Sequence, residues 1–295
     1  MTVLTIRHRT TYRYQAQVRF QPHRLLLRPR ESRDLRLMNY DLQISPAAAV
    51  SWSHDPFGNA VATVDVLQTA DVLEFTSISE IELCAPAWPN FDIADSAASY
   101  PFSYSDDDWT DLGALTAAQY LDPGGRLSAW ARAFVRSTPT DTLALLKDLS
   151  NGVTGWVGYQ SRDVGSAHAP LETLDLGRGS CRDMAVLFVE AVRSLGFGAR
   201  IVSGYLHNPD RDQLGSVDAG STHAWAEVFV PGAGWITFDP TNRSVGGSNL
   251  APVAVGRDIR QLAPVAGGFE GPGGAFIGLW VGVEVTQSAS GLASA

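Results

Sequence analysis

The stretch from Gly177 to Gly196 constrains the fold most, because it predicts a helix that begins with a cysteine. Ser180 is suited to the N-cap, and Asp183, three residues later, completes a capping box. The glycine at 196 is suited to a C-terminal stop. Between them, apolar residues recur with helical spacing at Met184, Leu187, Phe188, Ala191, Val192 and Leu195. The pattern predicts an amphipathic helix of about four turns that starts at Cys181.

Two interpretations of Cys181 follow from this helix. The free N–H groups and the dipole at a helix N-terminus lower the pKa of a thiol and favour a thiolate nucleophile. Cys181 also lies three residues before Met184, on the apolar stripe, where a lone cysteine packs as a small hydrophobic residue. The helix alone leaves both interpretations open.

Composition bounds the class of protein. A chain of 295 residues is long enough for two domains. It has no apolar run near the roughly 18 residues of a membrane span, and its N-terminus alternates like a strand rather than a signal peptide. Two cysteines, Cys84 and Cys181, form no disulfide framework, and the net charge of −9 argues against a nucleic-acid partner. We expect a cytoplasmic protein that binds neither membrane nor nucleic acid.

Residues 1–90 are predicted to form a β-rich, antiparallel, sandwich-like N-terminal domain. Short apolar or alternating segments predict its strands at 3–6, 10–14, 25–28, 40–44, 50–54, 60–66 and 73–83. His8, His23 and His54 are scattered here, and we expect them on the surface or in turns rather than in a metal site.

The rest of the chain divides into a connector, a mixed core and an extension. Residues 91–120, with three consecutive aspartates from Asp106, predict a solvated connector. The core, 121–248, is predicted to contain helices at 127–136 and 140–156, a loop through His168, and the helix at Cys181. Strands at 199–206, 222–230 and 235–239 follow, with a polar loop at 207–221. Residues 249–295 predict a C-terminal β extension and tail. The whole chain is of the α+β class.

Cys181, His223 and Asp239 supply the three groups of a thiol-based catalytic triad: a nucleophile, a base and a group that orients the base. Strand register tests whether the last two can meet. If Val230 pairs with Trp235, His223 and Asp239 lie on opposite faces of the hairpin. If an irregular hairpin pairs Phe229 with Trp235, they share a face as diagonal neighbours.

Other interpretations of these residues remain open. His223 can be a structural strand histidine, and Asp239 can simply end a strand before Pro240. Glu227, on the same face as His223, is a second candidate for the acid. A zinc site is a further alternative, although the chain has no short ligand pair such as Cys-x-x-Cys. We predict no metal.

Four ordered blocks between about 120 and 245 resemble the transglutaminase-like superfamily core. They are Gly179-Ser180-Cys181-Arg182-Asp183, Arg193-Ser194-Leu195-Gly196 through Ala199 to Tyr205, His223-Ala224-Trp225-Ala226-Glu227, and Gly234-Trp235-Ile236-Thr237-Phe238-Asp239-Pro240-Thr241-Asn242. Residues 52–59 resemble the N-terminal domain of the bacterial members, and residues 253–259 with Pro264 resemble the same subfamily.

The resemblance implies a papain-like α+β core with Cys181 as nucleophile, His223 as base and Asp239 as orienting acid. It implies acyl transfer from an amide of a protein or peptide substrate, without a cofactor; hydrolysis and cross-linking both remain open. The Cys181 backbone N–H would be one oxyanion donor, and Trp156 and Trp225 are candidates for the oxyanion or substrate site. A catalytically silent binding or scaffold protein is the alternative, because some members have lost the triad. The oligomeric state is not predicted.

Overall fold

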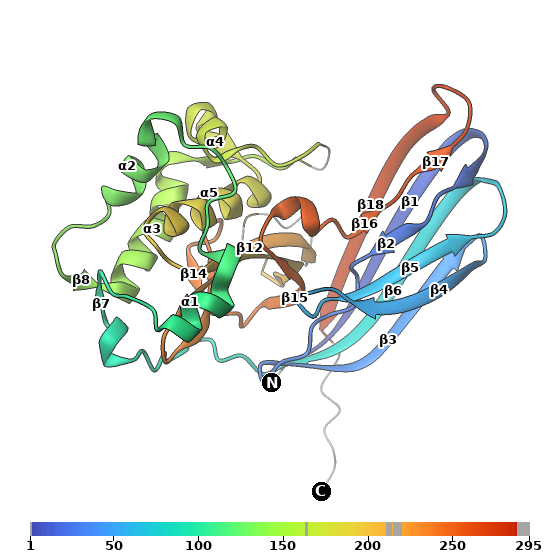
Figure 1. Cartoon of the computed structure of the whole chain (residues 1–295). Coiled ribbons are helices and arrows are strands. Elements are labelled where there is room, and N and C mark those ends of the chain that lie inside the picture. The colour runs from blue at the N-terminus through green and yellow to red at the C-terminus, as the bar shows by residue number, and fades with distance from the viewer. Residues whose placement is uncertain (1, 163–164, 211–213, 215–219, 288–295) are drawn as a thin grey trace, which may run out of the picture.

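Two units built on separate sheets lie side by side in the computed structural model, which describes residues 2–162, 165–210, 214 and 220–287 (Figure 1). The first unit is an antiparallel β domain, and the second packs helices against an antiparallel sheet. The predicted α+β class and the order of the two units are therefore confirmed.

The β domain is a sandwich. One sheet has the order β17-β1-β6-β3 with β18 also paired to β1, and the other has the order β16-β2-β5-β4. Large apolar side chains such as Tyr14, Phe20 and Phe75 fill the space between the sheets. The strands are β1 Thr2–Phe20, β2 His23–Leu25, β3 Leu35–Ser45, β4 Ala48–His54, β5 Ala60–Val66, β6 Ala70–Leu83, β16 Val265–Ala266, β17 Phe269–Glu270 and β18 Phe276–Gln287.

The expectation that His8 and His23 lie at the surface or in turns is wrong. They are only 1% and 2% exposed, whereas His54 is exposed. His8 is an inward position of β1, where its Nδ1 lies 3.0 Å from the Tyr205 hydroxyl and its Nε2 lies 2.9 Å from the Thr10 hydroxyl. Hydrogen bonds to both ring nitrogens make burial of this polar ring tolerable.

The segment predicted as a C-terminal extension divides between the two units. β15 (Leu250–Gly256) pairs with β11 and completes the sheet of the second unit. β16, β17 and β18 return to the β domain, where β18 pairs with β1 along most of its length. The first and last strands of the described residues, β1 and β18, therefore both lie in the β domain.

The second unit has the sheet order β14-β13-β12-β11-β15. These strands are β11 Ala199–His207, β12 Gly220–Val230, β13 Gly234–Asp239 and β14 Ser244–Val245. Two short strand pairs lie outside this sheet: β7 (Ser99–Tyr100) pairs with β8 (Thr140–Asp141), and β9 (Gly158–Tyr159) pairs with β10 (Arg178–Gly179). The helices are α1 Asp106–Leu112, α2 Arg126–Arg132, α3 Thr142–Trp156, α4 Pro170–Leu176 and α5 Cys181–Ser194. α5 packs on β12 and β11 and is surrounded by α2, α3 and α4.

Two helices lie where none was predicted. The connector contains α1, whose first turn holds the three consecutive aspartates and whose N-cap Ser105 accepts a 3.1 Å hydrogen bond from the Asp108 N–H. The loop through His168 contains α4, which has Pro170 at its first position and Gly177 (φ 60°) at its end. Pro at the start and Gly at the end are ordinary boundaries of a short helix.

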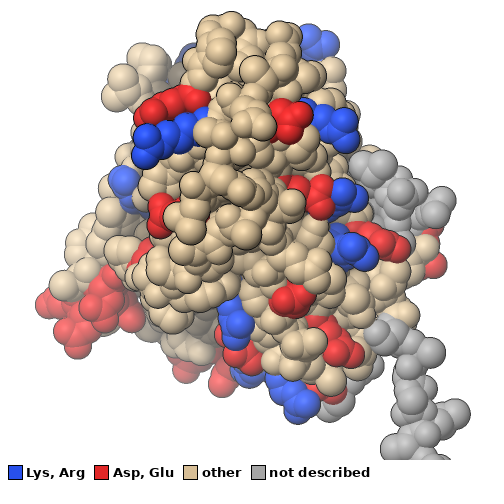
Figure 2. All heavy atoms as spheres, turned by 90° about the vertical axis from the view of Figure 1, so that its right-hand side faces the viewer, with Lys and Arg blue, Asp and Glu red and all other residues tan. Residues whose placement is uncertain are grey.

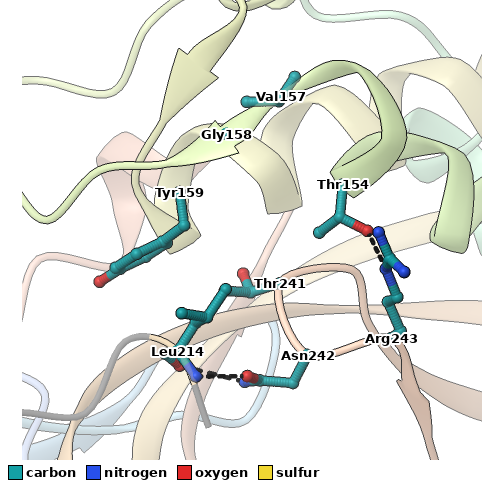
Figure 3. Close-up of a pocket in the computed structure, with 8 residues that line it drawn as sticks. All are labelled: Thr154, Val157, Gly158, Tyr159, Leu214, Thr241, Asn242 and Arg243. Carbon is teal, nitrogen blue, oxygen red and sulfur yellow. Dashed lines mark hydrogen bonds between the residues drawn. The ribbon is translucent and has the colours of Figure 1, made fainter.

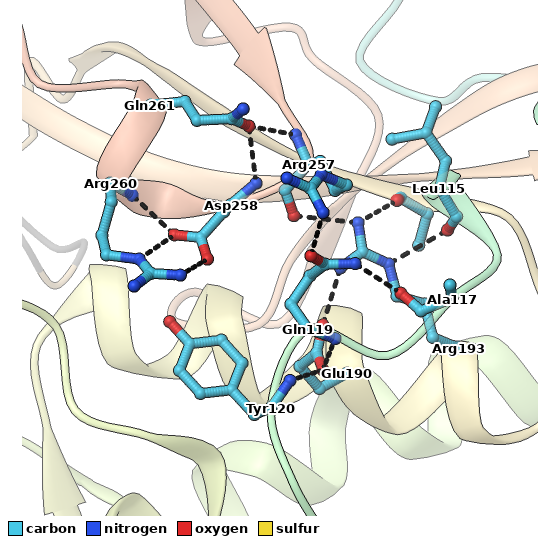
Figure 4. Close-up of polar contacts among 11 residues, drawn as sticks. Leu115, Ala117, Gln119, Tyr120, Glu190, Arg193, Arg257, Asp258, Arg260 and Gln261 are labelled. Carbon is cyan, nitrogen blue, oxygen red and sulfur yellow. Dashed lines mark hydrogen bonds and ion pairs between the residues drawn. The ribbon is translucent and has the colours of Figure 1, made fainter. Parts of the chain in front are cut away.

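The second half of α5 is anchored by a buried ion pair between Glu190 and Arg193 (Figure 4). Their side chains are 2% and 0% exposed, and their nitrogen and oxygen atoms lie 2.6 Å apart. Glu190 accepts hydrogen bonds from the backbone N–H groups of Gln119 and Tyr120, and Arg193 donates to the carbonyls of Leu115, Ala199 and Arg257. The network ties α5 to the connector and to the turn after β15.

No helix within the described ranges is both long and apolar enough to cross a membrane. On the outer face of the β domain, acidic and basic side chains are interspersed among uncharged ones (Figure 2).

Candidate active site

Cys181 is the first residue of α5 and is half-buried. The predicted capping interaction is present: the Asp183 carboxylate accepts from the N–H and the hydroxyl of Ser180 at 2.7 and 2.8 Å. Asp183 is fully buried, so these bonds hold the approach to Cys181 in one conformation.

The same carboxylate also fixes the segment that precedes α4. The Arg162 guanidinium donates to both Asp183 oxygens at 2.7 and 2.9 Å, and the His168 backbone N–H donates at 2.7 Å. Arg162 Nη1 lies 2.6 Å from His168 Nε2. A charge buried this deeply needs both a counter-ion and hydrogen bonds, and Arg162 supplies the counter-ion.

His223 and Asp239 meet because the hairpin has the register that the triad requires. Phe229 pairs with Trp235 and Val230 pairs with Gly234, so Asp239 continues toward the position diagonal to His223. His223 Nε2 lies 2.9 Å from Asp239 Oδ2, and the two side chains are 0% and 1% exposed. The turn between the strands uses Gly232 at φ 83°, where a Cβ would lie 2.5 Å from the Ala94 nitrogen.

The charges of the three groups favour an ion pair. Burial would raise the pKa of Cys181, but the charge of the neighbouring His223, together with a hydrogen bond from the Ala224 backbone, lowers it. Burial would lower the pKa of His223, but Asp239 and Cys181 together raise it to about 10. Burial would raise the pKa of Asp239, and His223 and Asn242 hold it below its usual range. The opposite shifts of the Cys181 and His223 pKa values both favour a thiolate beside an imidazolium.

The geometry leaves one ring nitrogen for the thiol. Nε2 of His223 is hydrogen-bonded to Asp239, whereas the buried Nδ1 has no hydrogen-bond partner among the described residues. Cys181 and His223 shift each other's pKa, so the thiol lies near this ring, and Nδ1 is the nitrogen that Asp239 leaves free for it. The ring itself stacks on Trp225, with centroids 6.2 Å apart.

The other candidates lie in different surroundings. Glu227 pairs with Arg200 at 2.6 Å and is not bonded to His223. Trp225 is 1% exposed and packs with Val202 and Leu206 behind His223. Trp156 is 61% exposed at the end of α3. The oxyanion or substrate role of the two tryptophans stays a prediction.

Residues just after the hairpin belong to the site, although no role was assigned to them from the sequence. The Asp239 carboxylate accepts hydrogen bonds from the backbone N–H groups of Thr241 and Asn242 at 3.0 and 3.3 Å and from the Asn242 side chain at 2.8 Å. The run Asp239-Pro240-Thr241-Asn242 was a signal of this turn, because aspartate side chains readily accept from backbone N–H groups two or three residues on.

A cavity of about 340 Å³ adjoins this turn (Figure 3). Its wall includes Tyr159 of β9, and β9 pairs with β10, which leads directly into Cys181. Its opposite wall includes Thr241 and Asn242. The cavity therefore lies between the approach to the thiol and the turn that holds Asp239. Over the described residues, no group of three His, Cys, Asp or Glu side chains is arranged to hold a metal ion.

Comparison with known families agrees with this architecture. Residues 4–82 match the bacterial transglutaminase-like N-terminal region, and residues 128–240 match the transglutaminase-like superfamily. The first match lies in the sandwich, and the second runs from α2 to the end of β13, so it contains Cys181, His223 and Asp239.

Full-length relatives are similar along nearly the whole chain. An uncharacterized protein of Mycobacterium tuberculosis is 30% identical over 282 residues, which cover 89% of this chain and 86% of that protein. An uncharacterized protein of Mycobacterium leprae is 28% identical over 291 residues, which cover 96% and 98%. A crystal structure described as a putative cysteine protease from Cytophaga hutchinsonii aligns with a TM-score of 0.74 at 16% identity, covering 98% of this chain and 91% of that one. The last likeness concerns the fold.

Proposed function

This chain belongs to the transglutaminase-like superfamily, and we propose that it is a cysteine-nucleophile enzyme of amide acyl transfer. The observation that carries the proposal is the bond from His223 Nε2 to Asp239 Oδ2, which leaves Nδ1 to the Cys181 sulfur. A lowered pKa at Cys181 and a raised pKa at His223 support the same roles, because they describe a thiolate stored beside its proton donor.

The first half-reaction forms a thioester. The Cys181 thiolate attacks the carbonyl carbon of an amide in a protein or peptide substrate, and a sulfur–carbon bond forms. The His223 imidazolium gives its proton to the amide nitrogen as the carbon–nitrogen bond breaks, so a neutral amine leaves. Asp239 keeps the ring oriented and stabilises its charge before the proton is transferred.

The second half-reaction releases the acyl group. Neutral His223 takes a proton from water or from an incoming amine, which attacks the thioester carbon and expels the thiolate. Water gives hydrolysis, whereas an amine gives transfer. The backbone N–H of Cys181, at the first turn of α5, is free of intrahelical bonds and is suited to stabilise the oxyanion in both halves.

An activated ester tests the proposal without knowledge of the natural substrate. p-Nitrophenyl acetate should release a burst of about one nitrophenolate per chain, the signature of an acylated nucleophile. Mass spectrometry should then find the acetyl group on the peptide that contains Cys181. Glycinamide added afterwards separates the two reaction types, because transfer yields acetylglycinamide and hydrolysis yields acetate.

Cys181→Ala is the matched control, and its circular dichroism and melting curve should equal those of the wild type. We expect it to lose the burst and the label. A folded wild-type protein without a burst, or an unchanged burst in Cys181→Ala, would contradict the proposal and favour a silent binding protein.

A further inference from the structure

The cavity beside the Asp239 turn has features that the proposed chemistry does not use. It is lined by Thr154, Val157, Gly158, Tyr159, Leu214, Thr241, Asn242 and Arg243 (Figure 3). Arg243 is the one ionisable side chain among these lining residues besides the phenol of Tyr159, and none of them is acidic. A cavity with a cation and no carboxylate in its wall favours an anionic group.

Thr241 supplies the first unexplained polar atom. The residue is 2% exposed, and its hydroxyl has no hydrogen-bond partner among the described residues. Figure 3 shows this hydroxyl directed from the turn toward the space beneath Val157 and Gly158. A buried hydroxyl without a partner costs free energy, so its persistence at this place calls for a ligand that accepts its proton.

The guanidinium of Arg243 is the second polar group at the cavity that the proposed chemistry does not use. Arg243 is the one non-glycine residue with a positive φ in the described ranges, at 54°, a region that L-residues with long side chains rarely adopt. Its Nε donates to the Thr154 hydroxyl at 2.5 Å, which fixes the guanidinium at the cavity. Within the described residues its terminal nitrogens form no ion pair. Their N–H groups are therefore available to bind a planar acceptor such as a carboxylate through two parallel hydrogen bonds.

We propose that this cavity binds a carboxylate of the substrate, with Arg243 and the Thr241 hydroxyl as its donors. The proposal rests on the proposed function and names its substrate class: amides that carry a carboxylate close to the bond that Cys181 attacks. The placement fits, because Thr241 follows Asp239 by two residues and Tyr159 pairs with Gly179, two residues before Cys181.

Alkylating probes of matched shape test the carboxylate directly. The first pair is N-chloroacetyl-glutamate amide and N-chloroacetyl-glutamine amide, and the second is N-chloroacetyl-alanine as free acid and as amide. The third pair is the chloromethyl ketones of acetyl-glutamate and acetyl-glutamine, which place the side chain on the acyl side. In each, the Cys181 sulfur displaces chloride, a sulfur–carbon bond forms, and mass spectrometry gives the rate. Together the pairs separate a side-chain carboxylate from a chain end.

We expect the acidic member of at least one pair to react about tenfold faster than its amide, because two charge-assisted donors meet it. The net charge of −9 repels every acidic probe and should slow its reaction. A faster reaction of the acidic member therefore indicates a local binding site for the carboxylate. Arg243→Gln should abolish the preference, and Thr241→Val should reduce it. Arg243→Lys, which keeps the charge without the fork, should retain part of it and guards against a folding defect in Arg243→Gln.

Arg178→Gln is the control for charge, because Arg178 is exposed three residues before Cys181 but does not line the cavity. It should keep the preference for the acidic probe. Iodoacetamide, which needs no pocket, separates the two proposals. Slow iodoacetamide labelling would contradict the catalytic proposal itself. Fast iodoacetamide labelling with equal rates within all three pairs, or a preference that survives in Arg243→Gln, would overturn the carboxylate site alone.

Discussion

His223 Nε2 lies 2.9 Å from Asp239 Oδ2, and that single bond leaves Nδ1 as the ring nitrogen without a partner among the described residues. It also gives the ring a charged partner, with the pKa of His223 raised to about 10 by Asp239 and Cys181 against the effect of burial. Asp239 therefore has two separable tasks, to orient the ring and to stabilise its positive charge.

Replacing Asp239 separates these tasks. Asp239→Asn retains an oxygen that can accept from Nε2 but loses the charge, so the pKa of His223 should fall toward 6.5 and less thiolate is stored at pH 7. We expect alkylation of Cys181 at pH 7 to slow about tenfold in Asp239→Asn. Asp239→Ala, which also loses orientation, should be slower still. Equal rates in the two variants would mean that orientation contributes nothing.

The stability of the protein should depend on the ion pair between the buried Asp183 and Arg162. Arg162→Gln leaves a fully buried carboxylate without its counter-ion, and we expect the free energy of unfolding to fall by about 2 kcal/mol. Asp183→Asn should cost at least as much. The free energy of unfolding of the double variant should fall by about 1–2 kcal/mol less than the sum of the two single effects. The reason is that neither variant side chain is then left as an unpaired charge or an unpaired partner. Urea unfolding measures all four proteins, and strict additivity would contradict this account of the pair.

Burial lowers the pKa of His8 to about 4, so the free energy of unfolding should depend on pH in the acidic range. The unfolded chain takes up a proton near pH 6.5 and the folded chain does so only near 4, so the unfolded state binds more protons between these values. The free energy of unfolding should fall by about 3 kcal/mol as the pH drops through this window.

His8→Gln, which can still bond to Tyr205 and Thr10, should flatten that part of the pH profile. His54→Gln, at an exposed position, is the control and should leave the profile unchanged. An unaltered acid slope in His8→Gln would show that another group is responsible.

Gly204 is the position where a methyl group should be least tolerated near the site. It pairs with His223 across the sheet, and a Cβ there would overlap the carbonyl oxygen of Ala251 and lie 2.7 Å from Trp225. We expect Gly204→Ala to destabilise the protein by about 1–3 kcal/mol. Gly155 of α3 has open space around its Cβ position, so Gly155→Ala should be neutral or stabilise by up to about 1 kcal/mol. Thermal melts compare the two, and similar effects would contradict the packing argument.

The helix at Cys181 could be predicted from the sequence because every local signal agreed. Its capping residues, apolar stripe and terminal glycine all indicate one start and one end, and α5 begins at Cys181 as predicted. The alternating segments of the sandwich were recognisable for the same reason. α4 was missed because it has only seven residues, Pro170–Leu176, which is too short for a periodic pattern.

The site could be predicted only in part, because its geometry depends on long-range register. The sequence offered two hairpin registers, and only the pairing of Phe229 with Trp235 brings His223 and Asp239 to one face. The inward position of His8 depends on Tyr205, which is 197 residues away. The cavity at Arg243 depends on contacts between α3 and the turn after β13, and no local pattern indicates them.

The rate of Cys181 alkylation by iodoacetamide, followed from pH 5 to pH 10 in the wild type and in His223→Ala, tests the central claim most directly. A stored ion pair predicts fast labelling that persists well below pH 8.5, the ordinary pKa of a thiol, and that is lost in His223→Ala. Slow labelling in both proteins, rising only as the pH approaches 8.5, would contradict an activated Cys181–His223 pair.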